Sequence, residues 1–210
     1  MHRLTALLIL ILMTWPLGAP SMVLAQTPQA PTTEATAPVI RLNGALLDLM
    51  RSSGREPKRT RLQRFLPVMQ DTFDLEAALR VAAAPYFERA SEPEQRQALD
   101  AFTRRSAAQY VDRFDSYEGQ TIQIVGERAG PRGTTLVDTD LASPGKAPVR
   151  LTYVLRPQGK NWRILDVLAK GTTSQVATQR SDFQTILRNG GLSGLTRDLN
   201  AHADRLLGGA

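Results

Sequence analysis

Apolar residues follow a helical spacing through the first half of the chain beyond residue 38. They recur three and four positions apart, which is the period of one face of an α-helix. Asp74 and the Ser91/Glu94 pair stand where helix-capping side chains are expected, and Pro67 is expected to kink or end the helix that contains it. The pattern predicts four helices, over 39–50, 58–69, 75–82 and from Ser91 to about 114.

Beyond residue 119 the period changes from helical to alternating. Short alternating runs separated by loops with Gly and Pro are typical of antiparallel strands. Helical spacing then returns on either side of Asn189-Gly190-Gly191, a sequence typical of a helix end. The strands are predicted at 121–125, 134–137, 149–155 and 162–168, and the final helices at 176–187 and 192–207. We therefore predict an α+β fold, with a four-stranded antiparallel twisted sheet covered on one face by N-terminal and C-terminal helices.

The first 38 residues differ from the rest. Residues 1–25 have a short basic start, an apolar run and small residues at positions 23 and 25, as in a secretory signal peptide cleaved before Gln26. Residues 26–38 are rich in Pro, Thr and Ala and contain a single charge, so we expect a disordered tether. A single folded domain over 39–210, exported to the periplasm, follows from this division.

Composition excludes much of enzyme chemistry. The 210-residue chain has no cysteine and only two histidines, His2 and His202, so it lacks thiolate chemistry and cannot build a multi-histidine metal site. Its glycines match neither a phosphate-binding loop nor the elbow of a serine hydrolase. We predict no catalytic residues, no metal and no cofactor.

Three groups of charged residues were considered as candidate functional sites. The net charge is +6, and a basic cluster over 51–64 is either a solvated surface or a contact for anionic lipid or an acidic partner. Asp138 and Asp140 lack the further oxygen ligands of a calcium loop. Asp166 lies in an apolar strand, where an ion pair or a solvent-facing position is favoured over a functional role.

Several short motifs resemble the MlaC (toluene-tolerance) family of periplasmic lipid-binding ABC-transport components. The resemblance runs from about 39 to 207 and is carried by combinations of residues rather than by one motif. These are Phe73-Asp74-Leu75, Glu94-Gln95-Arg96, Phe102-Thr103-Arg104, Tyr110 with Phe114 and Tyr117, Tyr153-Val154-Leu155, Gly159, Trp162-Arg163-Ile164 with Asp166-Val167, Gly171, and Arg180-Ser181 with Phe183. Within the family, segments 171–183 and 187–191 are most similar to the hopanoid-associated HpnM branch. Leu165 stands where the phospholipid-carrier branch usually has Tyr, which favours a hopanoid or a similar polycyclic lipid.

The resemblance implies a shuttle without enzymatic activity. It takes the apolar part of a hopanoid or phospholipid into a pocket between sheet and helices. Its implied partners are an inner-membrane transporter and an outer-membrane complex, with no nucleic acid among them. Arg180 is expected to pair with Asp166 or, less favoured, to meet a lipid head group.

Alternation along the strands and the apolar faces of the helices indicate which residues line the pocket. A shift of one residue in strand register would exchange the two faces of a strand. The predicted lipid-binding residues are Phe65, Met69, Leu79, Phe102, Tyr110, Ile122, Ile124, Leu136, Leu151, Tyr153, Trp162 and Phe183. Two alternatives remain at this point. One is an adaptor domain with a filled core that docks on a membrane complex, and the other is an enzyme that uses Asp138, Asp140 or Asp166.

Overall fold

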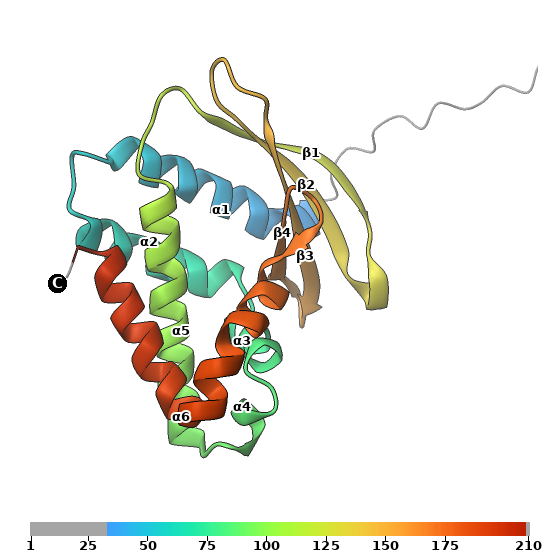
Figure 1. Ribbon diagram of the computed structural model, residues 1–210. Helices are drawn as coiled ribbons and strands as arrows, with labels where there is room; N and C mark the ends of the chain where they lie inside the picture. The colour runs from blue at the N-terminus through green and yellow to red at the C-terminus, as the bar shows by residue number, and fades with distance from the viewer. Residues whose placement is uncertain (1–32, 209–210) are drawn as a thin grey trace, which may run out of the picture.

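The computed structural model describes residues 33–208, which form a layer of helices against one face of an antiparallel sheet (Figure 1). The helices are α1 (Thr33–Ser52), α2 (Lys58–Thr72), α3 (Leu75–Ala82), α4 (Tyr86–Arg89), α5 (Glu92–Arg113) and α6 (Gln175–Leu206). The strands are β1 (Thr121–Ala129), β2 (Thr135–Ala142), β3 (Val149–Gln158), β4 (Asn161–Ala169) and β5 (Thr173–Ser174), and a short 3-10 turn joins β1 to β2. No helix within 33–208 is long and apolar enough to cross a bilayer.

Local capping explains several helix boundaries. The Asp74 carboxylate accepts the Ala77 amide at 3.1 Å at the start of α3, and Glu94 accepts the Ser91 amide at 3.0 Å at the start of α5. Both caps were predicted from sequence and are confirmed. Pro67 does not end α2, which continues to Thr72. Helix α4 is short and was not predicted.

Helix α1 starts earlier than the sequence predicts. It begins at Thr33, so residues 33–38 are helical and not part of a disordered tether. Ala35 and Thr36 are buried, with 4% and 1% of their surface exposed, because small side chains let the helix approach its neighbours closely. The predicted signal peptide (1–25) and residues 26–32 of the tether lie outside the described residues.

The sheet is an open meander in the order β1-β2-β3-β4-β5, with every neighbouring pair antiparallel. All four predicted strands are present, and each extends beyond its predicted range. The sheet has five strands rather than four because β5 pairs two residues with the end of β4. A two-residue strand is too short to show an alternating pattern in the sequence.

Strand register decides which side chains face the helices. Val137 is opposite Tyr153, and Tyr153 is opposite Val167, and all three are buried. Leu136 is opposite Val154 and therefore lies on the other face, so its predicted place on the pocket wall is wrong. The predicted strand 134–137 offered an apolar residue to each face, and alternation alone could not choose between Leu136 and Val137.

Candidate functional site

A cavity of about 350 Å³ lies between the sheet and helix α5. Its walls come from the end of α1, the last turns of α5 and the segment after it, strands β2, β3 and β4, and the start of α6. The lining residues are Met50, Gln109, Tyr110, Arg113, Phe114, Ser116, Gln120, Leu141, Ser143, Leu151, Val167 and Gln175. Its volume falls within the range of pockets that hold small ligands, about 300–1,000 Å³.

Aromatic and aliphatic side chains form much of the wall. The rings of Tyr110 and Phe114 stack on each other, with centroids 5.9 Å apart and planes 9° from parallel. Met50 and Val167 are buried beside them, and Leu151 is half-buried. Burial raises the pKa of the Tyr110 phenol, so this ring is uncharged at neutral pH. The wall therefore suits a hydrocarbon group more than a charged one.

A smaller cavity of about 40 Å³ extends this space between α3, α5 and α6. It shares Gln109, Tyr110, Val167 and Gln175 with the larger cavity, so the two have a common wall. Its other lining residues are Met69, Phe73, Leu75, Ala78, Phe102, Ser106, Asp166 and Gln179. Apolar side chains thus continue from the larger cavity toward the helical layer.

Four of the predicted lipid-binding residues line these cavities. Tyr110 lines both, Leu151 lines the larger one, and Met69 and Phe102 line the smaller one. The others pack elsewhere: Phe65, Leu79, Tyr153 and Phe183 lie in the buried core, and Ile122, Ile124, Leu136 and Trp162 are half-buried outside both cavities.

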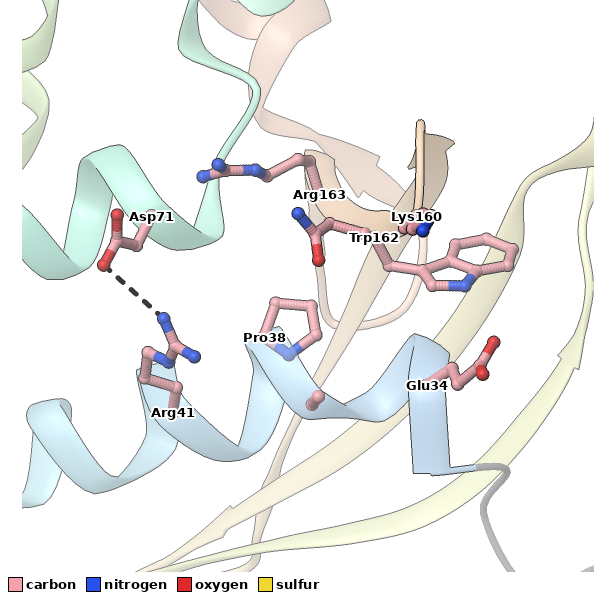
Figure 2. Close-up of a pocket in the computed structure, with 9 residues that line it drawn as sticks. Glu34, Pro38, Arg41, Asp71, Lys160, Trp162 and Arg163 are labelled. Atoms are coloured by element: carbon pink, nitrogen blue, oxygen red, sulfur yellow. Dashed lines mark hydrogen bonds and ion pairs between the residues drawn. The ribbon is translucent and has the colours of Figure 1, made fainter.

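Trp162 lies in a separate surface groove of about 520 Å³. This groove runs between the start of α1, the end of α2 and the β3–β4 turn, and Figure 2 shows the Trp162 indole beside Pro38 and Glu34. Charged side chains surround it, including the Arg41–Asp71 ion pair at 3.5 Å. Because its lining is charged, this groove is a poorer match for a hydrocarbon chain than the larger cavity between the sheet and α5, which lies behind β3.

Several wall residues were not predicted from the sequence, notably Met50, Phe114, Val167, Gln109 and Gln175. Met50 and Phe114 were recognised as apolar positions of their helices, but they come from two helices far apart in sequence. No pattern within either helix indicates that the two helix ends meet at one cavity. The glutamines carry no motif at all.

The carboxylates considered for catalysis or metal binding form structural contacts. Asp138 bonds to Arg128 and Thr152, and Asp140 bonds to Arg150 at 2.5 Å, on the sheet face opposite the helices. Within 33–208 no group of three or more His, Asp and Glu side chains is placed to hold a metal ion.

Asp166 organises the start of α6. Its carboxylate accepts the amides of Val167 at 2.7 Å and Val176 at 3.1 Å, and the Ser174 hydroxyl at 2.5 Å. Arg180 donates instead to the Val81 carbonyl oxygen at 3.2 Å. The expected Arg180–Asp166 pair is therefore wrong, because the backbone amides of the β4–α6 connection already occupy this carboxylate.

Most of the predicted basic cluster is held in ion pairs. Lys58 contacts Asp112 at 2.5 Å, Arg64 contacts Glu56 at 2.7 Å, and the buried Arg61 contacts Asp115. These contacts link α2 to the loop before it and to the end of α5, beside the cavity. They give the cluster a structural role.

Comparisons with known proteins identify the family of the sequence and a solved structure with a similar fold. The sequence model of the family described as MlaC protein matches residues 41–201. The fold is similar to that of a phospholipid-binding protein from Ralstonia solanacearum, solved in complex with a phospholipid, with a TM-score of 0.68 and 19% sequence identity. That match covers 82% of this chain and 98% of the other. With most of its length matched by the family model, the chain belongs to the MlaC family.

Proposed function

We propose that this protein is a periplasmic lipid carrier, which binds the apolar part of a membrane lipid between sheet and helices and shuttles it between the inner and outer membranes. The observation that carries the proposal is the apolar cavity behind β3, lined by Tyr110, Phe114 and Leu151, in a chain of the MlaC family. The fold similarity to a phospholipid-bound protein supports it.

The physical requirement for such a carrier is modest. A lipid leaving a bilayer exposes hydrocarbon to water, at about 25 cal/mol for each Å². The protein has only to replace that water with an apolar wall, and no bond of the lipid has to break. A binding and transport role, rather than an enzymatic one, is consistent with the structural use of Asp138, Asp140 and Asp166.

Two lipid classes are supported by different observations. The likeness of segments 171–183 and 187–191 to the HpnM branch supports a hopanoid, whereas the similar Ralstonia protein supports a phospholipid. The predicted signal peptide and the family support the periplasm as its location. An inner-membrane transporter and an outer-membrane complex are the partners that this role requires.

Native mass spectrometry of protein purified from its own periplasm tests the proposal. We expect a bound lipid mass, and we expect Leu151→Glu to lose it because the new carboxylate lies on the cavity wall. Leu151→Trp, which fills the cavity without adding charge, covers the case in which the glutamate variant unfolds. Val125→Glu is the matched control, since Val125 is 43% exposed on β1 and lines neither cavity.

The outcomes separate the carrier from the adaptor. Lipid bound to the wild type and to V125E, but not to L151W, supports the carrier. A wild-type protein that carries no lipid from the periplasm supports an adaptor domain with a filled core.

A further inference from the structure

The cavity behind β3 opens at the end of the sheet where β2 passes into β3. On its wall Met50 and Val167 are buried, whereas Arg113 at the end of α5 and Ser116 just beyond it are exposed. Ser143, which follows the end of β2, is half-buried. The lining thus becomes more exposed toward the end of α5 and the β2–β3 turn, and the opening lies between them.

Two chain segments lie side by side at this opening, and together we call them the collar. They are residues 113–120, which lead from α5 to β1, and residues 143–149, which form the β2–β3 turn and the first residue of β3. A Cβ at Gly119 would lie 3.4 Å from the Pro144 side chain, so the two segments approach closely. Figure 1 shows both at the same end of the molecule.

The collar exposes large apolar side chains. Tyr117 is 42% exposed and Val149 is 45% exposed, and they are two of the five exposed large apolar residues in the described chain. Pro144, at the turn, is also exposed. Val149 is opposite Leu141 of the cavity wall. Apolar surface therefore continues from the inside of the cavity to the outside of the molecule.

Positive charge surrounds these apolar side chains. Arg113 and Lys146 are exposed, and neither forms an ion pair with any residue that the structure describes. Arg51, at the end of α1, lies over the Tyr117 ring at 5.3 Å, and its contact with Asp48 spans 4.0 Å. The whole chain has a net charge of +6.

Negative charge at the collar is smaller. It has two carboxylates, and one of them, Asp115, is already paired with Arg61 and Lys58. Glu118 is the other, and it forms no ion pair within the described part of the chain. The collar and its surroundings therefore attract anions.

An anionic bilayer surface fits this combination of groups. It attracts lysine and arginine without requiring a matching partner for each one. Tyrosine is enriched at the interface between hydrocarbon and water, where its ring is in an apolar environment and its hydroxyl is hydrated. A bilayer also accepts isolated apolar side chains without a complementary pocket, whereas an acidic partner protein would have to provide one.

We propose that the collar is a membrane-docking surface, which places the cavity opening against an anionic lipid bilayer. Tyr117, Pro144 and Val149 enter the interface, and Arg113 and Lys146 lie among the anionic head groups. The inference rests on the proposed carrier function and adds that the protein contacts the bilayer itself, in addition to any transport complex.

Vesicle flotation of protein purified from its own periplasm tests the charged part of the collar. We expect binding to vesicles of phosphatidylglycerol, which are anionic, and not to vesicles of phosphatidylcholine, which have no net charge, and added salt should weaken it. Lys146→Gln should lower the partition coefficient about fivefold, the factor for one cation near an anionic surface. Lys160→Gln is the matched control, because Lys160 is also exposed and without an ion pair in the described chain, but lies in the turn at the opposite end of β3.

The apolar part is tested by a second pair of variants. Val149→Asp should lower the partition coefficient at least about fivefold, because it adds a repelled carboxylate where an apolar side chain meets the interface. Val125→Asp is its control, since Val125 is equally exposed, at 43%, but lies on β1 outside the collar. All four positions are exposed, so the variants retain the core.

Tryptophan fluorescence reports the orientation of the protein on the bilayer. Tyr117→Trp places an indole in the collar, and its emission should move to shorter wavelength when phosphatidylglycerol vesicles are added. The wild-type protein carries Trp162 at the opposite end of the sheet, in the groove beside Pro38, so its emission should not change.

Each outcome of these experiments decides between docking and its alternatives. Equal partition of wild type, K146Q and V149D overturns the inference, and so does a K160Q protein that loses as much binding as K146Q. A protein that carries lipid in native mass spectrometry but does not bind phosphatidylglycerol vesicles also overturns it, and leaves the carrier function in place with the collar facing a protein partner. Vesicle binding through the collar by a protein that carries no lipid supports the docking surface and rejects the carrier.

Discussion

At the residue scale, the best-enclosed charge is Arg61 of α2. It is 1% exposed, donates to the Leu49 carbonyl at 3.2 Å and pairs with Asp115, which also accepts the Ser53 hydroxyl at 2.9 Å. The group therefore joins α1, α2 and the segment after α5 near Met50 and Phe114 of the cavity wall. The basic cluster is visible in the sequence but this partner is not, because Asp115 is more than fifty residues away from Arg61.

Asp115→Asn is expected to destabilise the protein at neutral pH. It leaves the Arg61 guanidinium buried without a counter-charge, a change that costs roughly 3 kcal/mol in the free energy of unfolding. Urea unfolding at pH 7 measures it. Asp48→Asn is the control, since its pair with Arg51 spans 4.0 Å between exposed side chains and is worth under about 1 kcal/mol. Equal effects of the two variants would show that Arg61 does not depend on Asp115.

The difference in the free energy of unfolding between wild type and D115N should also depend on pH. Burial acts to raise the pKa of Asp115, but hydrogen bonds from Ser53 and Arg61 and the charges of Arg61 and Lys58 outweigh it and lower the pKa. A carboxyl with a lowered pKa stabilises the fold above its unfolded pKa, about 3.9, and that contribution is lost as pH falls through the folded value. In urea unfolding, the difference in free energy between wild type and D115N should therefore be largest near neutral pH and shrink below about pH 4. A constant gap down to pH 2 would contradict this assignment.

At the element scale, α6 changes direction sharply at one residue. Gly191 has φ 61° and ψ −161°, whereas the flanking residues are helical, and Figure 1 shows the second half returning along α5. This region of backbone space is essentially restricted to glycine. The bend lets one helix cover α3 and the sheet and also pack against α5.

Gly191→Ala should therefore lower stability, by about 1–3 kcal/mol, because alanine is strained at this φ and ψ. The neighbouring Gly190→Ala is a matched control, since Gly190 does not have positive φ and a Cβ there meets nothing within 4 Å. Alanine at 190 should leave stability unchanged or raise it by up to about 1 kcal/mol. Thermal unfolding of both variants measures the contrast, and a G191A protein as stable as G190A would rule out strain at the bend.

Sequence patterns predicted the elements better than their ends. Long amphipathic runs and the Asp74 and Ser91 caps gave α2, α3 and α5 close to their observed bounds. The start of α1 was not predicted because the small side chains of Ala35 and Thr36 do not stand out in the apolar pattern, although both are buried. The four-residue α4 and the two-residue β5 are shorter than any period that could reveal them.

At the scale of the whole molecule, the site depends on distant elements meeting. Tyr110 and Leu151 were predicted as wall residues because each belongs to the regular apolar pattern of its own helix or strand. Met50 and Val167 were not, since their places on the cavity wall come from neighbours in other elements. A residue's place in a helix stripe or strand face can be predicted, but the empty volume between layers follows only from packing.

Bound lipid should raise the thermal stability of the wild-type protein. A ligand that binds only the folded state stabilises it by about 2.7 kcal/mol when present at one hundred times its Kd. For a chain of this length that free energy corresponds to a rise in Tm of roughly 5–10 °C. Differential scanning calorimetry of lipid-loaded and delipidated protein measures the rise, with Leu151→Trp as the variant in which both preparations should melt together because its cavity is filled. If delipidated wild type melts at the same temperature as the loaded protein, the folded state gains nothing from a ligand, and the cavity behind β3 is not its binding site.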